Sequence, residues 1–137
     1  MKIKLVQSLL VLALMTLATS GAVLAAAEVA KTVDVKQALV MHDAGALLLD
    51  VREVSEYAES HVAGSTLIPL GQLKHRLLEI GADKSKPVAL ICRSGRRSAE
   101  ALKLLEQAGF SAAVNVGGGM IAWQKAGLPV VTGAQLR

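Results

Sequence analysis

Short apolar runs alternate with segments of helical periodicity along most of the chain, and this alternation restricts the possible folds more than any other feature. The runs span residues 46–51, 66–68, 88–91 and 112–116. Each run is too short for a confident helix and suits a strand that is buried on both faces. Strands that alternate with helices build a mainly parallel sheet with helices on both faces. The sequence therefore predicts an α/β fold.

Helix signals lie between the apolar runs. Asp34 is a typical N-cap residue, and Gln37 follows at the position that a capping box requires. A later segment carries Leu73, Leu77 and Ile80 at helical spacing. The predicted helices cover residues 34–44, 53–60, 73–80, 97–108 and 120–125.

The first 25 residues of the 137-residue chain have the layout of a secretory signal peptide. Two lysines give a positive start, residues 9–18 form an apolar centre, and small residues precede the predicted cleavage after Ala25 or Ala27. Cleavage would leave residues 26–137 as one exported domain without stable membrane association. The alternative is an uncleaved membrane anchor, because residues 5–27 carry no charge and a spanning helix needs about 20 residues.

Composition excludes several classes of partner. The formal net charge of +4 includes the two lysines of the predicted signal peptide, and the chain has one Tyr, one Phe and one Trp. No basic stripe interleaved with aromatic residues is present, so we expect no nucleic-acid partner. No cluster of His, Cys, Asp and Glu has the spacing of metal ligands, and the glycines at 117–119 lack that of a dinucleotide fingerprint. We therefore expect neither a metal nor a cofactor.

The only cysteine, Cys92, stands where the predicted strand 88–91 ends, and a helix begins a few residues later. One glycine and three arginines follow it. A strand–loop–helix turn directs backbone N–H groups and the positive end of the helix dipole at one spot. Such surroundings lower the pKa of a thiol from about 8.5 and make the thiolate the main species. Cys92 is therefore a candidate nucleophile, and the alternative is a buried, inert cysteine.

Other side chains are weaker candidates for catalysis. His61 could form a Cys–His pair with Cys92, but no residue that would orient its ring is evident, and the competing interpretation is a structural hydrogen-bonding role. His42 and His75 fall on predicted helical faces, and we expect them at the surface. Asp50, Cys92 and Gly117 all follow predicted strand ends, so we expect them at one edge of the sheet.

Four motifs in order resemble those of rhodanese-like sulfurtransferases. They are Leu-Leu-Asp-Val-Arg-Glu at 48–53, then His-Val-Ala-Gly-Ser at 61–65 with Tyr57 before it and Ile-Pro-Leu at 68–70 after it, Cys-Arg-Ser-Gly-Arg-Arg-Ser at 92–98, and Gly-Gly-Gly-Met-Ile-Ala-Trp at 117–123. The resemblance covers about residues 32–133. The exported single-domain form is also similar to the small periplasmic thiosulfate sulfurtransferases of Gram-negative bacteria.

The resemblance implies a single rhodanese-like domain, a five-stranded parallel sheet with helices on both faces. Cys92 would take a sulfane sulfur from a small anionic donor such as thiosulfate and hold it as a persulfide. A thiophilic acceptor, a small molecule or a protein thiol, would then receive it. The resemblance places substrate binding at Arg93, Ser94, Gly95, Arg96 and Arg97. Their backbone N–H groups would stabilise the persulfide, and Arg97, together with Arg93 or Arg96, would orient the anionic donor.

The length of the loop refines this expectation. Cys92 to Arg97 spans six residues, whereas the related phosphatase and arsenate-reductase branch has one residue more, which accommodates a tetrahedral oxyanion. The shorter loop favours a sulfur ligand over a tetrahedral oxyanion.

By the same resemblance Asp50 and Arg52 are structural or supporting residues, as we expect of His61. Two functions share this chemistry: an enzyme that turns over, and a sulfur carrier that serves one protein partner.

Overall fold

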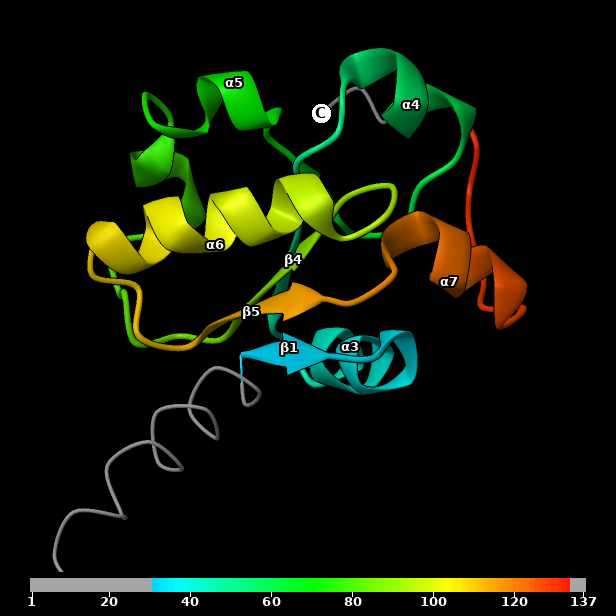
Figure 1. Ribbon diagram of the computed structural model, residues 1–137, viewed down its shortest axis with the longest axis horizontal. Helices are drawn as coiled ribbons and strands as arrows, with labels where there is room; N and C mark the ends of the chain where they lie inside the picture. The colour runs from blue at the N-terminus through cyan, green and yellow to red at the C-terminus, as the bar shows by residue number, and fades with distance from the viewer. Residues whose placement is uncertain (1–30, 134–137) are drawn as a thin grey trace, which may run out of the picture. The chain divides into compact units, whose positions relative to one another are not determined.

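The computed structural model describes residues 31–133 (Figure 1). The strands are β1 Thr32–Val33, β2 Leu47–Asp50, β3 Thr66–Leu67, β4 Val88–Ile91 and β5 Ala113–Val116. The helices are α3 Val35–Asp43, α4 Val54–Glu59, α5 Leu70–Leu73, α6 Arg96–Gln107 and α7 Gly119–Lys125, and a 3-10 turn, η1, spans Leu77–Ile80. Strands and helices alternate as the sequence predicts. The predicted signal peptide, or the alternative anchor, lies outside the described residues.

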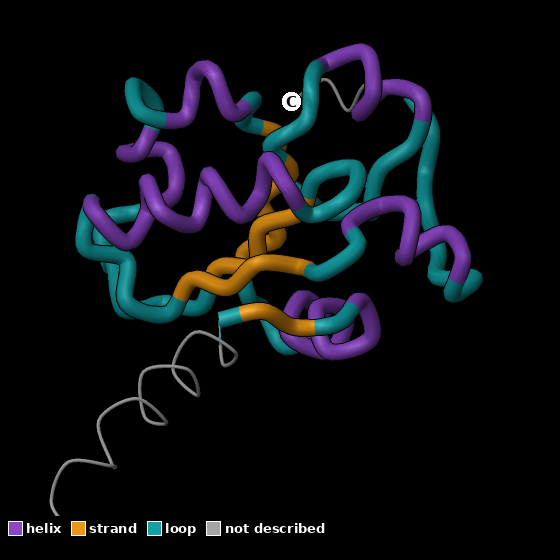
Figure 2. Tube along the Cα trace, viewed as in Figure 1, coloured by secondary structure: helices purple, strands orange, loops and turns teal. Residues whose placement is uncertain are grey.

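The strands form one five-stranded sheet in the order β1-β5-β4-β2-β3, and every pair is parallel. Figure 2 shows these strands in the middle of the domain with helices around them. Asp50 on β2 lies opposite Ile91 on β4, and Leu90 on β4 lies opposite Asn115 on β5. Asp50 is the last residue of β2, and Cys92 and Gly117 directly follow β4 and β5, so these three residues lie at one edge of the sheet. Both the predicted fold class and the predicted convergence are confirmed.

Helices cover both faces of the sheet because alternate side chains of each strand point to opposite faces. Leu90 and Cys92 belong to an apolar cluster with residues of α5 and α6, whereas Ala89 and Ile91 belong to a second cluster with residues of α3 and α7. Figure 1 shows α6 on one side of the strands and α3 on the other. Alternation therefore assigns the cysteine to the face that α6 covers.

Local sequence signals account for where the helices begin. Asp34 Oδ1 accepts the N–H of Gln37 at 2.8 Å, and Gln37 Oε1 accepts the N–H of Asp34 at 2.9 Å. This confirms the predicted capping box of α3. Helix α6 begins one residue earlier than predicted and buries Ala101, Leu102 and Leu105 against the sheet.

The prediction of one helix through residues 73–80 is wrong. The chain forms the short helix α5 and then the 3-10 turn η1, with three residues between them. At the break, Arg76 has φ −118° and ψ 18°, which is not a helical conformation. Leu77 and Ile80 still pack against the α6 cluster, so two short turns satisfy the apolar spacing that suggested a single helix.

Candidate active site

Cys92 follows the last residue of β4 and lies fully buried, with 0% of its surface exposed. It is a free cysteine. Three residues, Arg93, Ser94 and Gly95, connect it to α6. This short connection directs the beginning of a 12-residue helix, with its unpaired N–H groups, toward the sulfur.

The sulfur of Cys92 receives hydrogen bonds from the loop and from α6. The N–H of Gly95 donates to Sγ at 3.1 Å, and the hydroxyl of Ser98 lies 3.3 Å from Sγ. Burial alone would raise the pKa of the thiol, but hydrogen bonds from the Ser98 hydroxyl and from the N–H groups of Ser98, Gly95 and Ser94 outweigh it. The pKa of Cys92 therefore lies below its ordinary value, the direction that the sequence predicts.

Ser98 links the sulfur to a second buried side chain. Its hydroxyl donates to Asn115 Oδ1 at 2.6 Å, and Asn115 Nδ2 donates to the carbonyl oxygen of Gly95 at 3.2 Å. The bond to Gly95 fixes the amide so that Oδ1 must accept. Ser98 has one hydroxyl proton and two acceptors, Asn115 Oδ1 and the sulfur. The state of Cys92 is therefore coupled to the direction in which the Ser98 hydroxyl points.

Two glycines shape the backbone around the cysteine. Gly95 has φ +96°, a left-handed conformation that side chains disfavour, and it places its N–H toward the sulfur. Gly119 has φ +55°, and a Cβ there would overlap the carbonyl oxygen of Cys92 and lie 2.6 Å from that of Arg93. Met120 N–H donates to the Cys92 carbonyl at 2.8 Å. The start of α7 thus closes on the loop and fixes its position.

The three arginines of the loop differ in their surroundings. Arg97 forms a two-bond ion pair with Glu56 of α4, at 2.8 Å for each N–O distance. Arg93 and Arg96 are exposed, and neither forms an ion pair with any of residues 31–133. Arg93 and Glu56 also line a hollow of about 150 Å³ between α4 and α7. Within the described part of the chain, the loop therefore presents two cations without an ion-pair partner and one that is paired with a carboxylate.

Asp50 and Arg52 form a buried clamp close to this edge. Arg52 Nε donates to Asp50 Oδ1 at 2.9 Å and its Nη2 to Oδ2 at 2.6 Å. The same guanidinium also donates to the carbonyl oxygen of Ser60 at 2.8 Å, just past the end of α4. The clamp thus attaches α4 to β2, and it contributes no contact to the sulfur of Cys92. This geometry fits the structural role that the resemblance implied.

The histidines lie apart from the cysteine loop. His61 is buried, its ring stacks on Tyr57, and its Nδ1 lies 2.8 Å from the Tyr57 carbonyl oxygen. Its Nε2 has no hydrogen-bond partner among the described residues, and no contact joins it to Cys92. His75 is exposed as predicted, but His42 is partly buried, with Nε2 2.9 Å from the carbonyl oxygen of Ala63.

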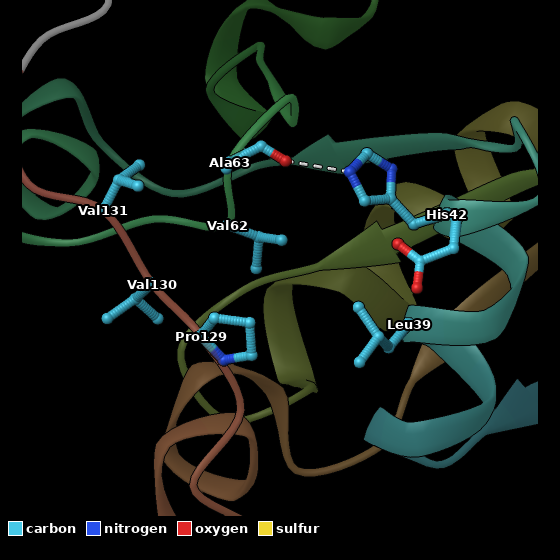
Figure 3. A pocket seen from close by; sticks show the side chains of 8 residues that line it. Leu39, His42, Val62, Ala63, Pro129, Val130 and Val131 are labelled. Carbon is cyan, nitrogen blue, oxygen red and sulfur yellow. Dashed lines mark hydrogen bonds between the residues drawn. The ribbon is translucent and has the colours of Figure 1, made fainter.

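His42 is partly buried because its ring reaches the backbone of Ala63, as Figure 3 shows. His42, Ala63 and Pro129 also line a hollow of about 150 Å³. None of residues 92–98 lines this hollow, so it is separate from the cysteine site.

Within residues 31–133 no group of three His, Cys, Asp or Glu side chains is placed to hold a metal ion. The helices of that same part of the chain include none that is long and apolar enough to span a membrane.

The structure adds three residues that the sequence analysis did not assign to the site. Ser98 falls on the buried stripe of α6 with Ala101 and Leu105, and a hydroxyl on an apolar stripe was a usable signal. Asn115 was a polar residue within a predicted buried strand, a signal of the same kind. Glu56 carried no such signal, because its partner Arg97 is distant in the sequence.

Comparison with known proteins agrees with this geometry. Residues 32–126 match the family model of the rhodanese-like domain. The solved structure of a rhodanese-related protein from Thermoplasma volcanium has a TM-score of 0.66 and 34% identity, covering 74% of this chain and 97% of that one. A protein of Allochromatium vinosum named "Sulfurtransferase" is 38% identical over 85 residues, which cover 62% of this chain and 78% of the relative.

Two further relatives differ in their named activity. "Thiosulfate sulfurtransferase PspE" of Escherichia coli is 36% identical over 70 residues, which cover 51% of this chain and 67% of the relative. "Putative sulfur carrier protein YrkF" of Bacillus subtilis is 40% identical over 76 residues, which cover 56% of this chain and 40% of the relative. The match therefore spans less than half of the Bacillus protein. Both names concern the handling of sulfur.

Proposed function

The chain belongs to the rhodanese-like domain family, and we propose that it is a sulfurtransferase that works through a persulfide on Cys92. The names of its relatives support sulfur transfer in general. One observation carries the more specific proposal: the Gly95 N–H donates to Cys92 Sγ at the beginning of α6, where Ser98 also reaches the sulfur. This arrangement stabilises a sulfur anion through hydrogen bonds at the N-terminus of a helix.

The proposed reaction has two balanced steps. The Cys92 thiolate attacks the outer sulfur of thiosulfate, the S–S bond of the donor breaks, and sulfite leaves with the bonding electron pair. The product is the Cys92 persulfide anion. An acceptor nucleophile, cyanide in an assay, then attacks the outer sulfur of the persulfide, which yields thiocyanate and regenerates the thiolate. No proton is consumed in either step, so the site needs anion stabilisation more than acid–base catalysis.

The residues around Cys92 fit these steps. The N–H groups of the loop and the Ser98 hydroxyl stabilise negative charge on sulfur in both the thiolate and the persulfide. Arg93 and Arg96 are the exposed cations that could attract an anionic donor.

A sulfur carrier is the second candidate function, and the complete burial of Cys92 is the observation that favours it. A buried persulfide suits a cargo that is held until a specific partner thiol accepts it. The relative named as a putative sulfur carrier supports the same alternative. Carrier and enzyme would use the same cysteine, so they differ in turnover rather than in the residues of the site.

The test is thiosulfate:cyanide turnover by the full-length protein and by its Cys92→Ala variant. The sulfurtransferase proposal predicts thiocyanate formation that the substitution abolishes, and equal rates in both proteins would refute it. Mass spectrometry after thiosulfate treatment measures the persulfide directly as the mass of one added sulfur. A stable persulfide with negligible turnover would favour the carrier.

We also propose that the protein is exported and acts in the periplasm after cleavage at Ala25 or Ala27. The support is the layout of the N-terminal segment, with a positive start and an apolar centre at residues 9–18. N-terminal sequencing of the protein from a periplasmic fraction should begin at Ala26 or Glu28. A mature protein that keeps Met1 and sediments with membranes would instead support the anchor.

A further inference from the structure

Arg97 is the loop arginine with a fixed partner. Its Nη1 donates to Glu56 Oε2 and its Nη2 to Glu56 Oε1, each at 2.8 Å. The two side chains are only 27% and 25% exposed, so solvent screens their attraction incompletely. An anionic donor that recruited Arg97 would have to displace a carboxylate with the same bidentate geometry.

Glu56 is held in place by its own helix. Its Oε2 accepts the N–H of Glu53 at 3.0 Å, as part of the capping box that begins α4. The hydrogen bond from Arg97 is the largest cause that lowers the pKa of Glu56, which falls from 4.5 to about 2. The carboxylate is therefore charged, oriented and paired before any donor arrives.

The pairing determines how much positive charge the site offers. Arg52 is neutralised by Asp50 and Arg97 by Glu56, which leaves Arg93 and Arg96 as the loop cations without an ion-pair partner among residues 31–133. Arg93 and Glu56 line the same hollow. An anion attracted by Arg93 therefore also experiences the charge of Glu56.

We propose that Glu56 selects the sulfur donor by charge: by occupying Arg97, it disfavours dianionic thiosulfate relative to singly charged sulfane-sulfur donors such as thiosulfonates and persulfides. This inference rests on the proposed sulfurtransferase function. Glu56 is a specificity-determining residue that acts through Arg97, and it takes no part in bond formation.

Two donors of similar shape isolate the effect of charge. Thiosulfate carries two negative charges, and methanethiosulfonate carries one because a methyl group replaces an oxygen. In both, the Cys92 thiolate attacks the outer sulfur, forms the persulfide and releases either sulfite or methanesulfinate with the bonding pair. The ratio of kcat/KM for thiosulfate to kcat/KM for methanethiosulfonate therefore reports charge selection, with the chemistry of attack held nearly constant.

The experiment measures this ratio in the full-length wild type and in Glu56→Gln. Glutamine also serves at the N3 position of a capping box, so we expect α4 to begin at the same residue. The negative charge and one acceptor for Arg97 are lost. We expect the ratio to rise about threefold or more, because the charge of Arg97, no longer paired with a carboxylate, attracts a dianion more strongly than a monoanion. Glu59→Gln is the matched control, because Glu59 lines the same hollow but pairs with no arginine among the described residues. Its ratio should change less than twofold.

The double variant Glu56→Gln/Arg97→Gln tests the route of the effect. If Glu56 acts by neutralising Arg97, the second substitution should return the ratio close to the wild-type value. An unchanged ratio in Glu56→Gln, an equal rise in Glu59→Gln, or a rise that persists in the double variant would each overturn the proposal.

Alkylation of Cys92 separates failure of this proposal from failure of the proposed function. Iodoacetate is an anion and iodoacetamide is neutral. The same Cys92 thiolate attacks the CH2 carbon of either reagent and displaces iodide, so a change in the pKa of the thiol cancels in the ratio of the two rate constants. We expect Glu56→Gln to raise the iodoacetate-to-iodoacetamide ratio about threefold or more. If the wild type uses neither sulfur donor, the sulfurtransferase proposal fails, and the alkylation ratio alone then decides whether Glu56 selects by charge.

Discussion

Replacement of Ser98 by alanine tests how the protein stabilises the Cys92 thiolate. The hydroxyl lies 3.3 Å from Sγ, and a hydrogen bond to a charged group contributes about 1.5–3 kcal/mol. At 1.36 kcal/mol per pKa unit, complete loss would raise the pKa of the thiol by about one to two units. Asn115 Oδ1 competes for the same proton at 2.6 Å, so the thiolate receives only part of this stabilisation. We therefore expect a rise of about one unit in Ser98→Ala.

The assay is the rate of Cys92 alkylation by iodoacetamide as a function of pH. The protein has one cysteine, so the label reports a single site. Ser94→Ala is the matched control, because it removes an exposed hydroxyl of the same loop but keeps the backbone N–H that faces the sulfur. A midpoint in Ser98→Ala within about 0.3 units of wild type, with the fold intact by circular dichroism, would refute the reasoning.

Asn115→Ala examines the competition from the other side. Without Oδ1 the hydroxyl of Ser98 donates to the sulfur alone, so the midpoint should fall rather than rise. Opposite shifts in the Ser98 and Asn115 variants would support competition for one proton. A rise in both would instead mean that the network stabilises the thiolate only as a rigid unit.

Three further predictions concern stability, measured as the free energy of unfolding in urea. Glu56→Gln should lower the free energy of unfolding by about 1–2 kcal/mol at pH 7, a value reduced for the partial exposure of the pair. The pKa of Glu56 is lowered to about 2, so the ion pair stabilises the wild type fully above pH 4.5. The difference between the two proteins should vanish as the pH falls toward 2. Asp50→Asn should cost about 3–5 kcal/mol, since it leaves the buried Arg52 charge without a carboxylate, whereas Asp43→Asn at the exposed end of α3 should change stability by less than about 0.5 kcal/mol. Gly119→Ala should prevent stable folding because its Cβ would overlap the backbone of Cys92 and Arg93. Gly71→Ala, with open space around it, should be neutral or slightly stabilising. Equal stabilities of the two alanine variants would contradict this account.

Four of the five strands and the edge that carries Cys92 could be predicted because local patterns determine them, whereas the two-residue strand β1 carries no such pattern. Four short apolar runs mark the buried strands, and parallel pairing then places residues after Asp50 and Ile91 at one edge. The capping box at Asp34 needs only side chains three residues apart. The break after α5 could not be predicted, because Leu77 and Ile80 reach the α6 cluster from a separate 3-10 turn just as well as from a continuous helix.

The site was less predictable because its partners come from distant elements. The resemblance names Arg97 first among the three arginines after Cys92, but no local pattern predicts its ion pair. Only the packing of α4 against the loop brings Arg97 to Glu56. Ser98 and Asn115 lie on different elements, and their single shared proton is visible only once β5 and α6 are placed together. Features that depend on residues close in the sequence could be predicted, and features that depend on tertiary contacts could not.

Different groups stabilise the Cys92 thiolate and present positive charge at the surface of the site. The thiolate is stabilised at short range by hydrogen-bond donors of Gly95, Ser94 and Ser98, which are fixed by the backbone and by α6. The guanidinium of Arg97 is directed to Glu56, and those of Arg93 and Arg96 reach the surface. The two sets are linked at Arg97, because the charge of the Cys92 thiolate is one of the causes that raise the pKa of this arginine. The hydrogen bonds to the sulfur come from other groups, so we expect a change at Glu56 to alter the charge presented to a donor more than it alters these bonds.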